Sequence, residues 1–167
     1  MLNDPKNKNN YKIGIISDTH GLLRPEVFTA LQGSDLIIHA GDIGDLQIID
    51  KLEAISPVVA VRGNIDNETR AYNLKKTEVV DLGGHTFYIL HDVSRLDIGP
   101  SSSHVSAVIH GHTHRPDIRE HDGVLYINPG SAGPRRPRLP VTVAVLNIKG
   151  KKLNAGIVDL KQDRIDK

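Results

Sequence analysis

Short apolar runs alternate with helix-type patterns in the first part of the chain. Pro25 stands where a helix begins, and apolar residues on one helical face follow it. A second helical pattern follows Asp45, a capping residue, and ends before Pro57. The runs typical of buried strands cover residues 12–17, 36–40 and 58–61. This order of strands and helices predicts parallel strands joined by right-handed crossovers.

The second half of the chain has further apolar runs, some separated by two-residue turns, which predict hairpins and buried strands. Gly83-Gly84 and Lys149-Gly150 are the expected two-residue turns. Strands are expected at residues 77–82, 85–91, 105–110, 124–128, 142–148 and 151–160. We therefore expect an α/β fold in which two sheets of mixed parallel and antiparallel strands form a β-sandwich flanked by helices.

Length and composition indicate one folded domain. The 167 residues are 38% hydrophobic and 25% charged, with a net charge of +1 and no cysteine. Residues 1–10 have little to bury and are expected to form a disordered leader before a single domain over residues 11–167. The leader lacks an apolar core of the signal-peptide type, and no run reaches the ~20 apolar residues of a membrane helix. We expect a cytoplasmic protein without a membrane partner.

Side chains that bind divalent metals follow the predicted strands. Because residues beyond the carboxyl ends of parallel strands gather at one edge of a sheet, we expect these side chains to meet there. Residues two apart in an extended backbone point the same way, so we expect Asp18 and His20 to face the same side, and likewise His112 and His114. Two Asp, one Asn and four His suffice for two ions that share a ligand, an arrangement suited to hydrolysis at phosphorus. The motifs are Asp18-Thr19-His20, Gly41-Asp42, Gly63-Asn64, His91 and His112-Thr113-His114.

In this order, the motifs resemble those of the calcineurin-like metallophosphoesterase superfamily, and most of all its small bacterial and archaeal phosphodiesterases. The resemblance runs from Ile13 to about Gly133 and includes the loop Asn128-Pro129-Gly130-Ser131. It implies a phosphodiesterase that hydrolyses phosphate diesters through attack by a hydroxide bridging two divalent metals.

The resemblance also implies the role of each residue. Asp42, Asn64 and His91 would have catalytic roles. The ligands of the first ion would be Asp18, His20 and His114, those of the second Asn64, His91 and His112, and Asp42 would bridge both. Manganese is expected by analogy with the group, with iron, zinc or nickel as alternatives because the donors are oxygen and imidazole without sulfur.

One position departs from the pattern of larger superfamily members. Those proteins carry a His directly after the Gly-Asn pair, where it helps the leaving group depart, and this chain has Ile65. The leaving group must then be acidic already or take its proton from water. Asp66 is expected to orient a ligand, and His39 and His110 are expected to support the site from behind.

A basic run at residues 133–138 is the one concentrated charge feature. We interpret it first as a solvated, proline-stiffened loop. The alternative is that Arg135 or Arg136 contacts a substrate phosphate, because guanidinium groups match phosphate oxygens.

Several functions would share these ligands. The expected partner is a small phosphodiester, but a phosphomonoesterase or a nuclease would need the same metals, so nucleic acid is not excluded as a substrate. A non-catalytic scaffold is a further alternative, because one subunit of the retromer coat has this fold. Scaffolds can lose site residues, whereas all seven positions are intact here, which favours catalysis. Association into a homo-oligomer is also possible, through a sheet edge or the basic run.

Overall fold

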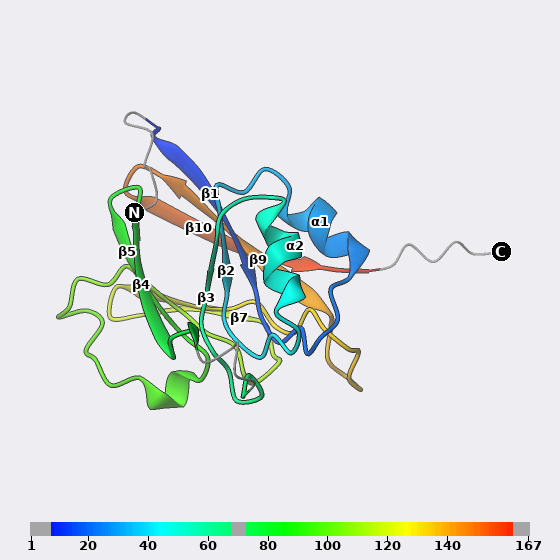
Figure 1. Cartoon of the computed structure of the whole chain (residues 1–167). Helices are drawn as coiled ribbons and strands as arrows, with labels where there is room; N and C mark the ends of the chain where they lie inside the picture. Colours follow the sequence, from blue (N-terminus) through cyan, green and yellow to red (C-terminus); the bar gives the residue numbers. More distant parts are fainter. Residues whose placement is uncertain (1–7, 68–72, 162–167) are drawn as a thin grey trace.

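The computed structural model describes residues 8–67 and 73–161, which form two five-stranded sheets (Figure 1). The first sheet contains, in spatial order, β10 (Lys152–Asp159), β9 (Thr142–Lys149), β1 (Asn10–Ile16), β2 (Leu36–His39) and β3 (Val58–Ala60). The second contains β4 (Thr77–Leu82), β5 (His85–Leu90), β6 (Ala107–Ile109), β8 (Val124–Asn128) and β7 (Asp117–His121). The expected two-sheet fold with mixed strand directions is confirmed.

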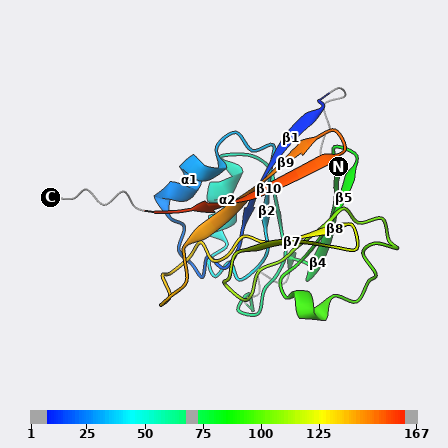
Figure 2. The same ribbon diagram turned by 180° about the vertical axis from the view of Figure 1, so that it is seen from behind.

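The first sheet has the predicted parallel core. Strands β1, β2 and β3 run parallel, connected by α1 (Pro25–Leu31) and α2 (Gln47–Glu53). Asp45 supports the start of α2, since its side chain accepts a hydrogen bond from the Gln47 amide at 2.9 Å. Both helices cover the face of this sheet that points away from β4 and β5 (Figures 1 and 2).

Two apolar layers hold the sandwich together. The buried residues between the sheets come from both of them and include Ile13, Ile38, Phe87, Ile89 and Ile109. A second layer lies between the helices and the first sheet, where Leu31 and Leu52 pack with Ile37. Burying such side chains stabilises the fold by about 1.5–3 kcal/mol each.

Within residues 8–67 and 73–161, α-helices flank the sandwich on one side only. The outer face of the second sheet carries Tyr88, Leu90 and Val108, and the apolar residues packed against them come from the segment around a 3-10 helix, η2 (Val93–Arg95). The expectation of helices outside therefore holds for the first sheet. On the second sheet, a short irregular segment that contributes Val93, Leu96 and Ile98 covers part of the outer face instead.

The two predicted hairpins form, with one shift of register. Gly83 and Gly84 are the turn between β4 and β5, and both have positive φ values of 60° and 79°, as a type I′ turn requires. Between β9 and β10, Lys149 pairs with Lys152, so the turn residues are Gly150 and Lys151. The predicted turn at Lys149-Gly150 was wrong by one residue.

Strand β7 was missed. Its sequence, Asp-Ile-Arg-Glu-His, is mostly charged, because it is an edge strand with one neighbour and an exposed surface. The signal that reveals it is Asp122-Gly123, a hairpin turn pair with positive φ directly before β8.

The expected leader falls mostly outside the described residues. Residues 1–7 are not among them, and Asn10, the last residue of the expected leader, already begins β1. None of the helices in the described part of the chain is long and apolar enough to cross a membrane.

Candidate metal centre

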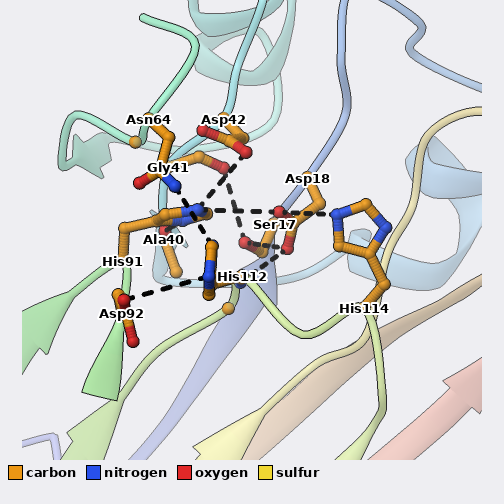
Figure 3. Close-up of polar contacts among 12 residues, drawn as sticks. Ser17, Asp18, Ala40, Gly41, Asp42, Asn64, His91, Asp92, His112 and His114 are labelled. Atoms are coloured by element: carbon orange, nitrogen blue, oxygen red, sulfur yellow. Dashed lines mark hydrogen bonds and ion pairs between the residues drawn. The ribbon is translucent and has the colours of Figure 1, made fainter. Parts of the chain in front are cut away.

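The loops that follow five strands bring the seven predicted ligands to one edge of the sandwich. Figure 3 shows the side chains of Asp42, Asn64, His91, His112 and His114 converging around Asp18. The residues follow the strands in chain order: Asp18 and His20 after β1, Asp42 after β2, Asn64 after β3, His91 after β5, and His112 and His114 after β6. The parallel strands of both sheets end at this edge, as the prediction required.

Five of the seven residues have a left-handed backbone, a conformation that costs about 1–3 kcal/mol at a non-glycine position. They are Asp18 (φ 56°), His20 (φ 45°), Asp42 (φ 55°), His112 (φ 73°) and His114 (φ 61°). The expectation of extended backbone in the first and last motif is therefore wrong. The chain must reverse sharply at the sheet edge, and Asp and His tolerate this conformation better than bulky residues. Backbone hydrogen bonds between loops offset the strain, including Asp18 N to Gly41 O and His20 N to Asp42 O, both 3.0 Å.

Asp18, His20 and His114 form one group of metal-binding atoms. The Nε2 atom of His114 lies 3.3 Å from Asp18 Oδ1 and 3.4 Å from His20 Nε2. His20 Nε2 lies 3.9 Å from Asp18 Oδ1. One ligand atom from each residue lies within 4.8 Å of the others, so the three could hold one ion between them.

Asp42 and His91 form a second group with Asp18. His91 Nε2 lies 3.3 Å from Asp42 Oδ2, and its Nδ1–H donates to the Ala40 carbonyl at 2.7 Å. A backbone carbonyl behind the ring is the usual partner of a metal-binding histidine, because it fixes the tautomer that leaves Nε2 free. Asp42 Oδ1 accepts a hydrogen bond from the Ile65 amide at 3.0 Å. Burial raises the pKa of Asp42, but His91 and this amide outweigh it and hold the pKa at about 2.

Asn64 and His112 lie together at the open side of the site. Asn64 Nδ2 is 3.4 Å from His112 Nδ1, and the rings of His112 and His91 are 5.2 Å apart between centroids. The opposite nitrogen of His112, Nε2, lies 3.8 Å from the Asp92 carboxylate. His112 therefore presents Nδ1 to the site, while Asp92 stands behind the ring.

Two buried polar atoms show that the site fits a cation. Asp18 Oδ1 and His91 Nε2 are buried, and neither makes a hydrogen bond with any residue that the structure describes. Burial raises the pKa of Asp18 above its ordinary value, although a hydrogen bond from Ser17 and the nearby His91 and His114 oppose this. A buried carboxylate with too little compensating positive charge is costly, and a divalent ion would remove that cost.

Asp66 joins the loops after β2 and β3. Its carboxylate accepts hydrogen bonds from the backbone amides of Ile43, Gly44 and Gly63 at 2.8–3.2 Å. Asp66 thus acts on the backbone around Asp42, and its contacts with the predicted ligands run through that backbone. Gly63 lets the loop after β3 lie directly against Asp42. A Cβ atom at this position would lie 2.2 Å from both the amide nitrogen and Oδ1 of Asp42.

His39 supports the loops from behind, as expected. Gly41 N donates to His39 Nδ1 at 3.2 Å, and Thr19 Oγ1, which donates to Ile43 O, accepts from His39 Nε2 at 3.0 Å. Burial lowers the pKa of His39 to about 4, so the ring is neutral. His110 is also buried, but its ring nitrogens have no hydrogen-bond partner among the described residues.

The loop after β8 closes the back of the site. Asn128 Nδ2 donates to Gly111 O and Thr113 Oγ1, both at 3.0 Å, and so shapes the last histidine motif. Ser131 Oγ donates to the Asp18 carbonyl at 3.0 Å. The resemblance of residues 128–131 to a family loop therefore corresponds to direct contacts with two ligand-bearing loops.

Sequence reasoning missed two residues of the site. Ser17 Oγ donates to Asp18 Oδ2 at 2.7 Å, and Asp92 stands behind His112. Each is the chain neighbour of a predicted ligand, and that adjacency was the available signal. It is a weak signal, because only the folded loops decide which way a neighbouring side chain points.

Comparisons with known proteins identify the family of this chain. The model of the calcineurin-like phosphoesterase superfamily domain matches residues 11–151. A protein named "Probable metallophosphoesterase" from Methanothermobacter thermautotrophicus is 38% identical over 159 residues, 87% of this chain and 91% of that protein. A phosphodiesterase of Methanocaldococcus jannaschii is 30% identical over 160 residues, 84% of this chain and 95% of its own.

A solved structure supports the fold independently. Vps29 of Chaetomium thermophilum superimposes with a TM-score of 0.77 over 92% of this chain and 89% of its own, at 21% sequence identity. The family match covers every predicted ligand, and the fold places those ligands at one edge. The chain therefore belongs to the calcineurin-like phosphoesterase superfamily.

Proposed function

We propose that this chain is a phosphodiesterase that uses two divalent metal ions. The observation that carries the proposal is the convergence of seven oxygen and imidazole side chains at one edge, where Asp18 Oδ1 and His91 Nε2 are buried without a hydrogen bond to any described residue. The phosphodiesterase name of a 30% identical relative supports the choice of reaction. When bound, a pair of divalent ions supplies an activated water and positive charge against the phosphate.

The proposed ligands divide into two sets, with Asp42 between them. Asp42 Oδ2 lies 3.6 Å from His20 Nε2 and 3.3 Å from His91 Nε2, a position that suits a bridging carboxylate. The first set is Asp18, His20 and His114, and the second is Asn64, His91 and His112. Manganese is the proposed metal, with iron, zinc or nickel as alternatives, because hard oxygen and imidazole donors suit these ions.

The residue after Asn64 sets the proposed leaving-group preference. Ile65 follows Asn64 directly and is 43% exposed, and its hydrocarbon side chain offers no proton to a departing alkoxide. Substrates whose leaving group is acidic should therefore react fastest.

Arg136 is the proposed contact for a phosphate oxygen on the His114 side. Burial lowers the pKa of His114, Asp18 opposes this, and the positive charge of Arg136 adds to the lowering, which supports a place for Arg136 near His114. Arg136→Ala should raise KM more than it lowers kcat. If Arg135→Ala and Arg136→Ala both leave the kinetic constants unchanged, the loop has no such role.

The test of the proposed function is hydrolysis of bis-p-nitrophenyl phosphate by metal-stripped protein with Mn²⁺, Zn²⁺, Mg²⁺ or Fe²⁺ added back. Asp42→Asn should lower kcat at least about 100-fold, because it removes the charge between the two ligand sets. Asp45→Asn is the matched control, since Asp45 contacts the Gln47 amide outside the site and Asn caps a helix equally well. Activity that survives Asp42→Asn would contradict the proposal.

A scaffold is the second candidate, favoured by the similarity of the fold to Vps29. The same assay separates the two functions. Protein that binds two ions by calorimetry, yet hydrolyses no mono- or diester with any of the four metals, would be a scaffold. Faster hydrolysis of p-nitrophenyl phosphate, a monoester, or of oligonucleotides would indicate instead a phosphomonoesterase or a nuclease.

A further inference from the structure

A cavity of about 630 Å³ adjoins the open side of the metal centre. Asn64 and His91 line it, so an occupant of the cavity touches the predicted ligands at one end. The rest of its wall comes from the residues after β3, the start of β4 and the segment that follows β5. A volume of this size holds a nucleotide-sized group, whereas a phenyl ring would leave most of it empty.

The wall of this cavity carries more positive than negative side chains. Three cationic side chains line it, namely Arg62, Lys76 and Arg95, against the carboxylates of Asp92 and Asp97. Asp92 is already engaged, because it accepts hydrogen bonds from Ser94 N and Oγ at 3.0 and 2.8 Å and lies 3.8 Å from His112 Nε2. Its charge is therefore shared with the metal centre.

Lys76 is the least committed of the three cations. Arg95 has an ion-pair partner, with Nε 3.8 Å from Asp92 Oδ2. Lys76 makes no ion pair with any residue in ranges 8–67 and 73–161. Its neighbour Lys75, which lies outside the cavity wall, points to Glu78 instead at 3.9 Å. The positive charge of Lys76 is thus available to a ligand in the cavity.

We propose that the substrate's ester substituent fills this cavity and carries a second phosphate group that Lys76 and Arg62 bind. The inference rests on the proposed function, because it assigns one phosphate to the metals and the other to the cavity. Asn67, held by its hydrogen bond to Asn64 O at 3.1 Å, and Asp97 supply polar groups for the hydroxyls of a sugar between the two phosphates. The predicted substrate class is a compact, nucleotide-sized diester with a second phosphate.

The test compares two product-like probes on Mn²⁺-loaded protein by titration calorimetry. Adenosine 3′,5′-bisphosphate should bind about tenfold more tightly than adenosine 5′-monophosphate, as expected for a charged hydrogen bond. Lys76→Ala should bring the ratio of the two Kd values close to one. Lys75→Ala, an exposed neighbour outside the cavity, should leave that ratio unchanged.

Hydrolysis of bis-p-nitrophenyl phosphate by the same preparation separates the two proposals. Hydrolysis together with equal Kd values for both nucleotides would overturn this inference and leave the proposed function intact. Discrimination between the nucleotides without any hydrolysis would overturn the proposed function, and with it the assignment as a substrate pocket. If a tetranucleotide binds more tightly than the bisphosphate, the inference of a compact substrate is wrong and the cavity binds a nucleic-acid strand.

Discussion

The metal centre has a buried half and an open half, and the two are held in different ways. Asp18, Asp42, His91 and His114 are 0%, 4%, 4% and 7% exposed, and backbone groups or neighbouring carboxylates surround them. Asn64 and Ile65 are exposed, and the side chain of His112 is 38% exposed. The two halves meet at the 630 Å³ cavity, which is lined by Asn64 of the open half and by His91 of the buried half.

This difference indicates a division of labour. Groups that must hold charge at fixed positions need burial and hydrogen bonds behind them, because a displacement of about 1 Å is costly for chemistry. Groups that meet substrate must stay accessible. We therefore expect changes in the buried half to reduce stability and metal affinity together. Changes in the open half should alter metal affinity or substrate preference with little effect on stability.

The largest effect is expected from Gly63→Ala, which breaks the buried half. The added Cβ atom would lie 2.2 Å from Asp42 N and Oδ1, so the loops after β2 and β3 must move apart. We expect a loss of about 3 kcal/mol in the free energy of unfolding, the upper end for overpacking, and weaker metal binding. Urea unfolding of metal-free protein and calorimetry with Mn²⁺ would measure both.

Gly156→Ala is the control for this change, because a Cβ atom at position 156 would meet nothing within 4 Å. Equal stability of the two variants would contradict the close packing of these loops.

The second prediction concerns the neutral ring of His39 behind the buried half. Burial lowers its pKa from 6.5 to about 4. Between these pH values the unfolded chain binds a proton that the folded protein does not, so the free energy of unfolding falls as the pH falls. The protonation of His39 should lower the free energy of unfolding by about 3 kcal/mol between pH 7 and pH 4, with little further change below pH 4.

The measurement is the pH dependence of unfolding for the metal-free protein and for His39→Gln. The variant should be less stable at pH 7 because of its lost hydrogen bonds, and its stability should change less between pH 6.5 and 4. Parallel curves over that range would show that His39 is not the buried neutral group described here.

Asp92→Asn tests the open half and should have a smaller effect. It removes the charge behind His112 Nε2 without changing the size of the side chain. Loss of such a supporting group lowers metal affinity about 10- to 100-fold, while the free energy of unfolding without metal should change little. Asp122→Asn, in the exposed turn before β8, is the matched control. Unchanged affinity for Mn²⁺ in Asp92→Asn would mean that His112 does not depend on Asp92.

The smallest effect is expected from Ile65→His, which should alter substrate preference alone. A histidine at this exposed position can offer a proton to the leaving group. The ratio of rates for an alkyl and a p-nitrophenyl leaving group should rise by up to about tenfold, a small part of what a well-placed acid contributes. Ile65→Asn adds polarity without a suitable acid and should not change this ratio. An equal rise in both variants would point to polarity as the cause.

The secondary structure shows where local patterns are reliable. The strands of the βαβ half were predicted within one or two residues, because buried strands leave strong apolar patterns. The second helix ends at Glu53, earlier than the expected end before Pro57. Strand β7 was missed because it is an edge strand with mostly exposed, charged residues, in which Ile118 alone packs against the core between the sheets. The turn at Gly150-Lys151 was shifted by one residue. The register of a turn depends on which cross-strand pairs form. Lys149 pairs with Lys152 only in the folded sheet, and this pairing places the turn at Gly150 and Lys151.

The sequence by itself determined the donor types, their order and their place after strands, because these follow from local apolar patterns and from motif chemistry. Only the tertiary structure decided the left-handed backbone at five of the seven residues, the carboxylate of Asp92 behind His112, and the charged cavity beside Asn64. The reason is that the site joins loops as far apart as Asp18 and His114. The contacts between such loops depend on how two whole sheets pack, which no short stretch of sequence encodes.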